Sequence, residues 1–525
     1  MHWKNGLWLL ATGILILAGG CHLIVGIRDA EPYPPDAGAG GTAACTPSQT
    51  QVCYGGPEQT EGVGVCRRGT QACTPEGVWG ACEGEVLPGA EDCSAPGDED
   101  CNGYACSETA WVKQFGVQST NAYSSDIAVD LQTGDIYVTG SFSGALPIGS
   151  DTLDSQGGTR IAFLAKFDQQ GTPLWAQQFG EATDFAINAQ GTSVVVDGQG
   201  NVVLVGSADT PVNLGGAELP EGLFVGKFTP SGQHLWSLGC QTQGGTRRGA
   251  VDPSTNDVVV AGTFGSGGQP PITCGAVTFM SNGADVFVAR FAALDGSMIF
   301  AKQFGGSGSD NANDVAVDEQ GSILLGGNGD DLTLGGPPLA DGYVAKLASN
   351  GSHVWGKGIG AGWTAALALD ASGGLALTGS GSGILNFGDE DLAPVGAFDV
   401  FVARLDASGK HVWSRRFGSA GGNLSLGQDV AVDSKGNLAV SGTVTGNIAI
   451  DDVILAGNAT AFLAKVDANG QIAWSKTFGK GPCSLAFSSL DELVVACQSA
   501  APADFGKGLA TPVGESDLFL LKIAP

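Results

Sequence analysis

The sequence predicts an all-β protein whose larger part is built from repeated four-stranded units. Three observations lead to this fold class. An aromatic residue recurs every 55 to 64 residues, in phrases such as "PLWAQQFGE" (173–181) and "HVWSRRFGS" (411–419). The segments between these phrases alternate short apolar runs with glycine-containing turns, the pattern of β-hairpins. Glycine accounts for 85 of 525 residues, which suits many tight turns between short strands.

The spacing of the recurring aromatic predicts the number of repeats. It occurs at Trp111, Trp175, Trp236, Phe300, Trp355, Trp413 and Trp474. A period near 60 residues is long for a solenoid and suits a four-stranded propeller blade. Within each repeat, a segment such as "DVAVDSKGNLAVSG" (429–442) indicates one hairpin. A strand such as "VFVARLD" (400–406) and the following aromatic strand indicate the second hairpin.

The two ends of the repeat region predict how the ring closes. The last repeat stops after its third strand, "DLFLLKIAP" (517–525), and the first begins with an unpartnered strand, "WVKQFG" (111–116). The N-terminal strand can therefore complete the final sheet and remove an exposed edge. Residues 107–525 are predicted to form a seven-bladed β-propeller closed in this way. The large aromatics are expected to pack between blades.

The recurring phrases also carry a family resemblance. The W-S-x-x-F-G and F-V-A-K-L-D-A-x-G patterns resemble the SBBP β-propeller repeats of bacterial surface proteins, over residues 111–525. This resemblance implies a bacterial repeat protein exposed outside the cytoplasm.

The first 20 residues are predicted to be a signal peptide. Lys4 supplies a positive start, and the apolar run Gly6–Ala18 of 13 residues is too short for a membrane span. Ala18, Gly19 and Gly20 before Cys21 resemble a bacterial lipobox, although Ala18 stands where that motif usually has Leu.

In lipoproteins with this motif the cysteine carries lipid chains such as palmitate and becomes the new N-terminus. The resemblance predicts an exported protein anchored to a membrane through Cys21. His22 occupies a position where Asp often signals inner-membrane retention, which favours the outer membrane or cell surface. Ordinary cleavage at the same bond, or an uncleaved anchor, remain alternatives.

A linker and a small cysteine-rich module precede the propeller. Residues 21–44 contain the lipidation candidate and a segment rich in Pro, Gly and Ala, typical of an extended tether. Residues 45–106 contain eight cysteines and little apolar material, which predicts a disulfide-rich module whose connectivity is open. These cysteines are Cys45, Cys53, Cys66, Cys73, Cys82, Cys93, Cys101 and Cys106. The paired spacings of a zinc site are absent.

The cysteine-rich module contains one candidate metal site. Its "GVCRRGTQAC" (64–73) and "WGAC" (79–82) phrases resemble modules of secreted bacterial proteins that often end in an Asp/Asn-rich metal-binding motif. Asp98, Asp100 and Asn102 match the first positions of a calcium loop. The position that should hold Glu is Thr109, so an Asp-rich turn without Ca²⁺ is the alternative, and no other cofactor is predicted.

Four further cysteines lie in the propeller. Cys483 and Cys497 are equidistant from Leu490, at the centre of a predicted hairpin, and would face each other within disulfide reach. Cys240 ends an aromatic strand, and Cys274 lies in the next long loop on the same face. We therefore expect Cys240–Cys274 and Cys483–Cys497 disulfides.

The lengths of the connections predict which face carries function. Short turns such as "DSKGN" lie on one face, and each Asp in them is expected to bond the turn backbone: Asp130, Asp197, Asp318, Asp370 and Asp433. The long, variable connections must emerge on the opposite face, the usual layout of a binding surface.

Candidate ligand-binding residues lie where the innermost strands begin on that variable face. Asp126, Asp314 and Asp429 start three of these strands, and Tyr123 and Trp363 lie just before two of them. Carboxylates and aromatic faces at a channel mouth suit a glycan or a cation. The alternative is that they are solvated loop residues.

Composition and motifs narrow the function classes. A net charge of −29 argues against nucleic acid as a partner, although it can also serve solubility alone. His234, His353 and His411 each stand two residues before a repeat aromatic, so they cannot converge on one catalytic site.

The sequence therefore predicts a non-catalytic binding scaffold at the cell surface, for an extracellular protein or a glycan. The first alternative is a carbohydrate-active hydrolase or lyase that uses two carboxylates at the channel mouth. The second is a structural envelope protein.

Overall fold

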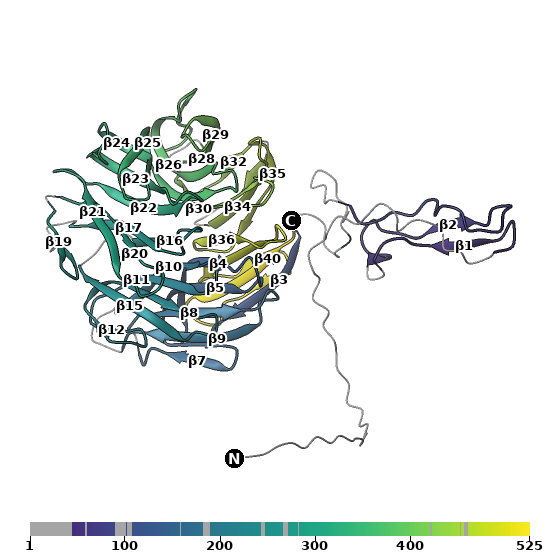
Figure 1. The fold of residues 1–525 in the computed structure, drawn as a ribbon, viewed down its shortest axis with the longest axis horizontal. Helices are drawn as coiled ribbons and strands as arrows, with labels where there is room; N and C mark the ends of the chain where they lie inside the picture. Colours follow the sequence, from purple (N-terminus) through teal and green to yellow (C-terminus); the bar gives the residue numbers. More distant parts are fainter. Residues whose placement is uncertain are drawn as a thin grey trace, which may run out of the picture. The chain divides into compact units, whose positions relative to one another are not determined.

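The computed structural model divides the chain into two compact units, drawn in Figure 1. The smaller contains Met1–Gly62 and Cys66–Pro88, and the larger contains Val63–Val65 and Gly89–Pro525. The structure describes residues 45–57, 60–89, 101, 108–157, 159–181, 189–242, 247–265, 271–281, 283–419, 423–451, 453–455 and 460–525. These described residues do not include the predicted signal peptide, the linker or Cys21. They also do not include Cys93, Asp98, Asp100, Asn102 and Cys106. In the described part of the chain, no helix is long and apolar enough to cross a membrane.

The smaller unit is held together chiefly by disulfides. Its strands β1 (Thr50–Cys53) and β2 (Gly69–Ala72) form an antiparallel pair. Cys45 bonds to Cys73 and Cys53 bonds to Cys82, which joins the two strands and the segments beside them. Cys66 of this unit is also disulfide-bonded, as is Cys101 in the predicted cysteine-rich region. The predicted disulfide-rich character is therefore present in the described part of this region.

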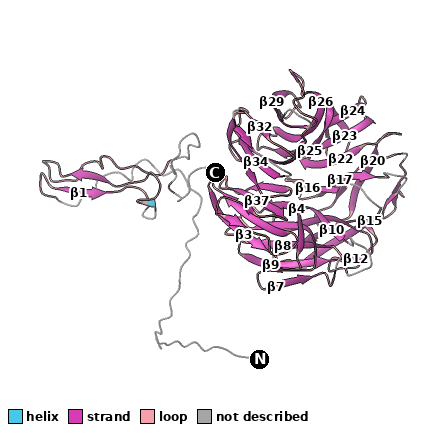
Figure 2. Ribbon diagram, turned by 180° about the vertical axis from the view of Figure 1, so that it is seen from behind, coloured by secondary structure: helices cyan, strands magenta, loops and turns pink. Residues whose placement is uncertain are grey.

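The larger unit is all-β and propeller-like, with four-stranded antiparallel groups that recur along the chain (Figure 2). In spatial order, the groups and their bounds are as follows: β4 (Asn121–Val129), β5 (Ile136–Ser143), β8 (Ile161–Phe167) and β9 (Pro173–Phe179); β10 (Ala189–Val196), β11 (Val202–Ala208), β14 (Gly222–Phe228) and β15 (His234–Gln241); β16 (Arg247–Val251), β17 (Val258–Phe264), β20 (Asp285–Phe291) and β21 (Met298–Phe304); β30 (Ser425–Val432), β31 (Leu438–Val444), β34 (Thr460–Val466) and β35 (Ile472–Phe478).

One sheet continues through two repeats. Its strands are β22 (Asn311–Val317), β23 (Ile323–Leu332), β24 (Leu339–Leu347), β25 (His353–Leu369), β26 (Leu375–Asn386), β28 (Asp399–Leu405) and β29 (His411–Phe417), with β27 (Asp391–Leu392) beside β26. The first half of β25 pairs with β24 and its second half pairs with β26. The sequence predicted a loop here. The strand instead continues through a bulge at Gly360, whose φ is 91°.

The two ends of the repeat region lie in one sheet. The order is β3 (Thr109–Phe115), β40 (Asp517–Ile523), β37 (Leu493–Ser499) and β36 (Cys483–Phe487). Trp111 pairs with Lys522 in the antiparallel β3–β40 ladder. The blue β3 and the yellow β40 therefore lie side by side in Figure 1. Backbone hydrogen bonds thus satisfy an edge that each terminal strand would otherwise expose.

Several of the long connections form small hairpins rather than irregular loops. These are β6 (Ala145–Ile148) with β7 (Asp151–Asp154), β12 (Val212–Asn213) with β13 (Glu218–Leu219), β18 (Ile272–Cys274) with β19 (Val277–Phe279), β32 (Ile448–Ile450) with β33 (Val453–Leu455), and β38 (Ala503–Asp504) with β39 (Leu509–Ala510). Leu146 and Ile148 of the first hairpin are buried in the core cluster of the adjacent sheet.

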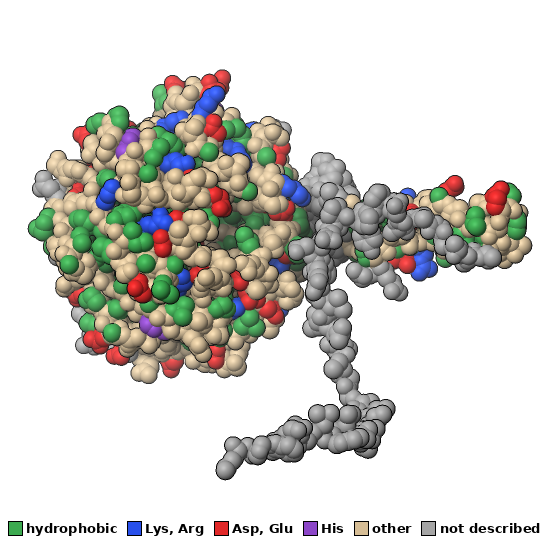
Figure 3. Space-filling model, in the orientation of Figure 1, with side chains coloured by type: hydrophobic (Ala, Val, Ile, Leu, Met, Phe, Trp, Pro, Cys, Tyr) green, Lys and Arg blue, Asp and Glu red, His purple; other side chains and the backbone are tan. Residues whose placement is uncertain are grey.

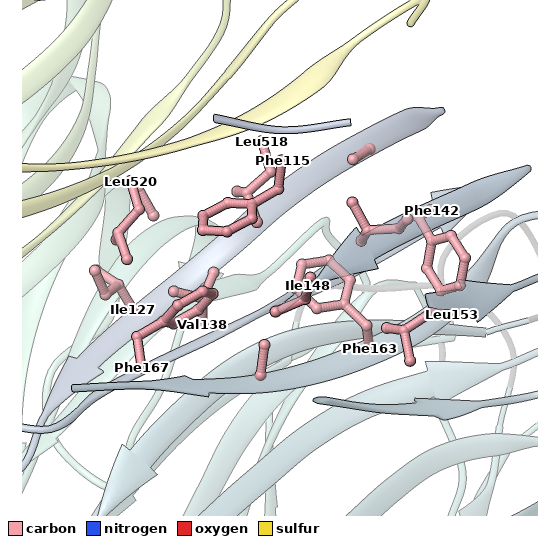
Figure 4. Packing of buried hydrophobic residues seen from close by; sticks show 14 of the residues in the cluster. Phe115, Ile127, Val138, Phe142, Ile148, Leu153, Phe163, Phe167, Leu518 and Leu520 are labelled. Atoms are coloured by element: carbon pink, nitrogen blue, oxygen red, sulfur yellow. The ribbon is translucent and has the colours of Figure 1, made fainter. Parts of the chain in front are cut away.

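The hydrophobic core lies between neighbouring sheets. Every residue of β8 is buried, and its side chains alternate between two clusters. Phe163 and Phe167 pack in the cluster that also contains Phe115 and Leu520, as Figure 4 shows, whereas Leu164 belongs to the cluster on the other face. Middle strands therefore read as continuous apolar runs, because both of their faces are covered.

Six of the seven repeat aromatics, all except Trp474, pack on the second short turn of the following repeat. A Cβ placed on Gly232 would lie 3.3 Å from the Trp175 ring, and one on Gly470 would lie 2.9 Å from the Trp413 ring. The Trp175 indole also donates a 3.1 Å hydrogen bond to the Pro230 carbonyl. The aromatic therefore joins one sheet to the next, which explains in physical terms why the phrase recurs.

Candidate functional site

A cavity of about 930 Å³ runs along the axis of the larger unit. It is lined by the innermost strand of each group: β4, β10, β16, β22, the second half of β25, β30 and β36. In these strands buried residues are interspersed with half-buried ones, because one face packs on the core and the other surrounds open space. The cavity is therefore the central channel of this unit.

Four of the five predicted binding residues line the channel. They are Asp126, Asp314, Trp363 and Asp429, which come from β4, β22, β25 and β30. The fifth, Tyr123, is not among the lining residues. The Arg160 guanidinium lies 3.8 Å from the centre of the Tyr123 ring. The structure thus brings together residues that are up to 303 positions apart in sequence, and it leaves Tyr123 outside the group.

The three aspartates occupy equivalent positions. Each directly follows a β-bulge in its inner strand, and each precedes the aspartate of the short turn by four residues. We call this place on each inner strand the ring position. By the same register it holds Asp126, Ser193, Arg248, Asp314, Ala366, Asp429 and Ser484.

The aspartates at the ring position join neighbouring inner strands. Asp126 Oδ1 accepts a 3.0 Å hydrogen bond from the Ile127 amide, and its Oδ2 accepts a 2.8 Å hydrogen bond from the Val194 amide of β10. Asp314 accepts in the same way from the Leu367 amide at 2.7 Å, and Asp429 accepts from the Leu485 amide at 2.7 Å. The carboxylates therefore have a structural role in addition to facing the channel.

Arg248 is the cation at this level of the channel, and the sequence analysis missed it. Its Nη1 donates to the Thr192 carbonyl and lies 3.9 Å from Asp126 Oδ2. About 33% of its side chain is exposed, into the channel that it lines. The signal was present in the sequence: Arg248 precedes Asp252 by four residues, as Asp314 precedes Asp318.

The channel shifts the pKa values of all four charged ring groups. Burial raises the pKa of Asp126 even though Arg248 and the hydrogen bonds oppose it. Burial likewise raises the pKa of Asp314 to about 6. Burial and the neighbouring Asp126 raise the pKa of Asp429 to about 8. Burial lowers the pKa of Arg248, but the three carboxylates outweigh it and hold that pKa above its ordinary value.

The chemical character of the channel changes along its length. At the ring position and before it the lining is polar, with Ser124, Gln190, Arg247 and Gln428 beside the four charged groups. Towards the short turns the lining becomes apolar, with Ala128, Val196, Val251, Val317 and Leu369. Trp363 lines the polar end, and its ring centre lies 5.4 Å from that of Phe398.

The other titratable groups singled out in the sequence lie elsewhere. His234 and His411 are on outer strands, where each ring contacts a serine hydroxyl three residues later, at 3.0 and 3.1 Å. The short-turn aspartates bond the turn backbone. Asp197 Oδ1, for example, accepts from the Gln199 amide at 2.8 Å, as expected for a structural turn.

The propeller disulfides lie where the hairpin geometry predicted them. Cys240 bonds to Cys274, which ties β15 to β18, and Cys483 bonds to Cys497 across β36 and β37. Within the described residues, no group of three or more His, Cys, Asp or Glu side chains could hold a metal ion. The candidate calcium ligands Asp98, Asp100 and Asn102 lie outside those residues.

Comparison with known proteins supports the repeat. Residues 110–141 match the family model of the SBBP β-propeller repeat. Among solved structures, the WD40 repeats of RRP9 are similar, with 10% identity, 80% of this chain and 99% of that chain covered, and a TM-score of 0.47. BamB from Moraxella catarrhalis shows 11% identity, coverage of 78% and 100%, and a TM-score of 0.36. A europium-containing methanol dehydrogenase shows 11% identity, coverage of 79% and 93%, and a TM-score of 0.36. No curated protein matches the chain.

Proposed function

We propose that this chain is an exported, lipid-anchored protein whose seven-bladed propeller binds an extracellular ligand at the mouth of its central channel without catalysing a reaction. One observation carries the proposal: charged and aromatic side chains from separate inner strands converge on one cavity of about 930 Å³. Cavities of roughly 300–1,000 Å³ lined by apolar groups and a few convergent polar groups are the usual form of a ligand site. The count of seven blades rests on the ring positions and on the β3–β40 pairing.

The hydrogen bonding of the three channel aspartates favours binding over catalysis. Both oxygens of Asp126, Asp314 and Asp429 accept backbone hydrogen bonds, so moving any of these side chains would break contacts between inner strands. Such fixed groups orient a ligand well. Figure 3 shows that acidic and basic side chains are scattered over the face in view rather than gathered in one field. Recognition at the channel mouth therefore requires no charged outer patch.

Site-specific photo-cross-linking on intact cells tests the binding site. A benzophenone amino acid replaces Trp363 at the channel mouth or, as the control, Lys435 in a short turn, whose side chain is 57% exposed. We expect a discrete cross-linked species from position 363 and none from position 435. Cross-linking from position 435 alone would show that the binding surface lies away from the channel. No cross-link at either position would favour the structural envelope protein.

The anchor is tested separately, through Cys21. Cells fed radiolabelled palmitate should label the wild-type chain, and Cys21→Ser should lose the label and leave the membrane fraction. A Cys21→Ser protein that still carries label and sediments with membranes would contradict the lipid anchor.

A carbohydrate-active enzyme is the second candidate. Its supporting observation is that the channel holds carboxyl groups of different acidity, with the pKa of Asp314 raised to about 6 and that of Asp429 to about 8. Acid and base pairs in glycosidases differ in this way. Polysaccharide cleavage that disappears in Asp314→Ala and Asp429→Ala would establish this candidate, and saturable binding without cleavage would exclude it.

A further inference from the structure

We propose, on the premise that the channel is the binding site, that it selects uncharged saccharides and that Arg248 sets this selectivity. The argument starts from the charges at the ring position. Three carboxyl groups and one guanidinium face the same space, with Arg247 nearby in the lining. An anionic ligand would meet the carboxylates of Asp126 and Asp314, and a cationic ligand would meet Arg248. Asp429, whose pKa is raised to about 8, is mostly uncharged at neutral pH. A charged ligand of either sign would therefore meet at least one group of like charge, whereas an uncharged polar ligand meets no repulsion.

The hydrogen-bonding capacity of these groups matches hydroxyls. Each carboxylate oxygen of Asp429 already accepts one backbone hydrogen bond and retains a second lone pair for a ligand. Arg248 uses Nη1 for the Thr192 carbonyl, and within the described residues no hydrogen bond occupies its Nε or Nη2. A hydroxyl both donates and accepts, so neighbouring hydroxyls of a sugar can donate to a carboxylate and accept from the guanidinium.

Gln428 supplies a second, independent indication. This bulge residue lies next to Asp429 and lines the channel. Its Oε1 is buried and has no hydrogen-bond partner among the described residues. A buried acceptor without a donor costs free energy, and a bound hydroxyl would satisfy it.

The remaining walls suit the apolar faces of a sugar ring. Trp363 offers an indole at the polar end of the channel, and the half-buried side chains of Ala128 and Val195 lie two residues past the ring position. Sugars present C–H faces that pack on such surfaces while their hydroxyls bond polar groups. Its volume of about 930 Å³ is sufficient for the end of an oligosaccharide.

Isothermal titration of the full-length, oxidised chain with three probe classes tests the inference. The probes are matched tetrasaccharides: neutral ones (maltotetraose, cellotetraose and mannotetraose), an acidic one (tetragalacturonate) and a basic one (the glucosamine tetramer). We expect at least one neutral probe to bind more tightly than both charged probes. Arg248→Gln should weaken that binding about tenfold or more, the effect of losing hydrogen bonds from a charged donor.

The variants distinguish a change in ligand selectivity from a general loss of folded structure. Arg248→Gln should also shift preference towards the basic probe, because the carboxylates of Asp126 and Asp314 then remain without their cation. Arg248→Lys should keep the discrimination against that probe. Arg415→Gln is the matched control, since Arg415 lies on β29 and bonds the Gly470 carbonyl outside the channel. Trp363→Ala serves as the second channel variant if Arg248→Gln does not fold.

The outcomes distinguish this inference from the proposed function. Preference for the basic or acidic probe that Trp363→Ala abolishes would overturn the selectivity for uncharged saccharides and leave the channel as the binding site. Neutral binding unaffected by both channel variants would show that the sugar binds elsewhere and overturn the role of Arg248. Failure of all probes at 10 mM would overturn the inference, and the photo-cross-linking experiment would then decide the proposed function alone.

Discussion

Asp429 and Leu485 lie on neighbouring inner strands, and the Leu485 amide donates a 2.7 Å hydrogen bond to Asp429 Oδ2. The same relationship joins Asp126 to Val194 and Asp314 to Leu367. Aspartates at the ring position thus hold adjacent sheets together at the wall of the channel. Their carboxylates replace the direct backbone pairing that separate sheets lack.

We predict that Asp429→Ala destabilises the larger unit by about 1–3 kcal/mol, because two amide donors lose their acceptor. Asp429→Asn retains one acceptor oxygen and should cost about half as much. Urea unfolding followed by tryptophan fluorescence measures both. Asp389→Ala is the control, since that side chain is 74% exposed, and it should change stability by less than about 0.5 kcal/mol. Equal effects of Asp429→Ala and Asp389→Ala would contradict the structural role.

The same carboxyl group predicts a pH dependence. The pKa of Asp429 is raised to about 8 in the folded state, above its unfolded value, so the folded state binds the proton more tightly. Stability should therefore fall as pH rises from 5 to 9, and Asp314, with a pKa of about 6, should add to the fall at the lower end. Asp429→Asn should have a shallower slope of melting temperature against pH across this range. A slope that is unchanged in Asp429→Asn would assign the pH dependence to other groups.

A second regular interaction involves the short turns. Lys227 Nζ lies 2.8 Å from Asp197 Oδ2, and their side chains are only 3% and 0% exposed. Burial alone would raise the pKa of Asp197, but the bond from Lys227 and those from the turn outweigh it and hold the pKa below its usual value. Comparable pairs link a third-strand cation to the first turn in other repeats, such as Lys346 with Asp318.

We predict that Lys227→Met destabilises the unit by about 3–5 kcal/mol, because it leaves the buried Asp197 carboxylate without its partner. Lys435→Met tests the same substitution at an exposed pair, where Lys435 is 57% exposed and 3.8 Å from Asp491, and should cost at most about 1 kcal/mol. Thermal unfolding of both variants at pH 7 measures the difference. Similar losses for the two substitutions would show that burial does not determine the strength of these pairs.

The sequence predicts much of this fold because the repeat carries redundant signals. The aromatic spacing and the unpaired ends predict the strand groups and the β3–β40 pairing that the structure contains. Hairpin symmetry predicts the position of Cys483 opposite Cys497. The sequence could not predict the continuous β25, because that strand depends on how the connection bends at Gly360 rather than on local composition.

The candidate site could be predicted only in part. Asp126, Asp314 and Asp429 drew attention as repeated acids, and the register brings them to one level of the channel. Arg248 occupies the position that holds aspartate in three other repeats. It was missed because recurring residues drew attention and a residue that differs from them did not. Tyr123 does not line the cavity and contacts Arg160 instead, a placement that tertiary packing determines.

The contact between a repeat aromatic and the next repeat's turn gives the last prediction. Gly470 has a φ of 86°, and an added Cβ would lie 2.9 Å from the Trp413 ring. Gly508 has a similar φ of 90°, with nothing within 4 Å of an added Cβ. Both substitutions to alanine incur the strain of a left-handed conformation, about 1–2 kcal/mol. Gly470→Ala must in addition displace the indole.

We therefore predict that Gly470→Ala costs clearly more than Gly508→Ala, by about 1–3 kcal/mol of overpacking. The excess should shrink when Trp413→Leu is combined with Gly470→Ala, because the smaller side chain leaves room for the new methyl group. A double-mutant cycle from urea unfolding isolates this coupling. Additive effects of the two substitutions would mean that the indole does not rest on the turn glycine. The recurrence of the aromatic would then have to be explained by burial within its own sheet.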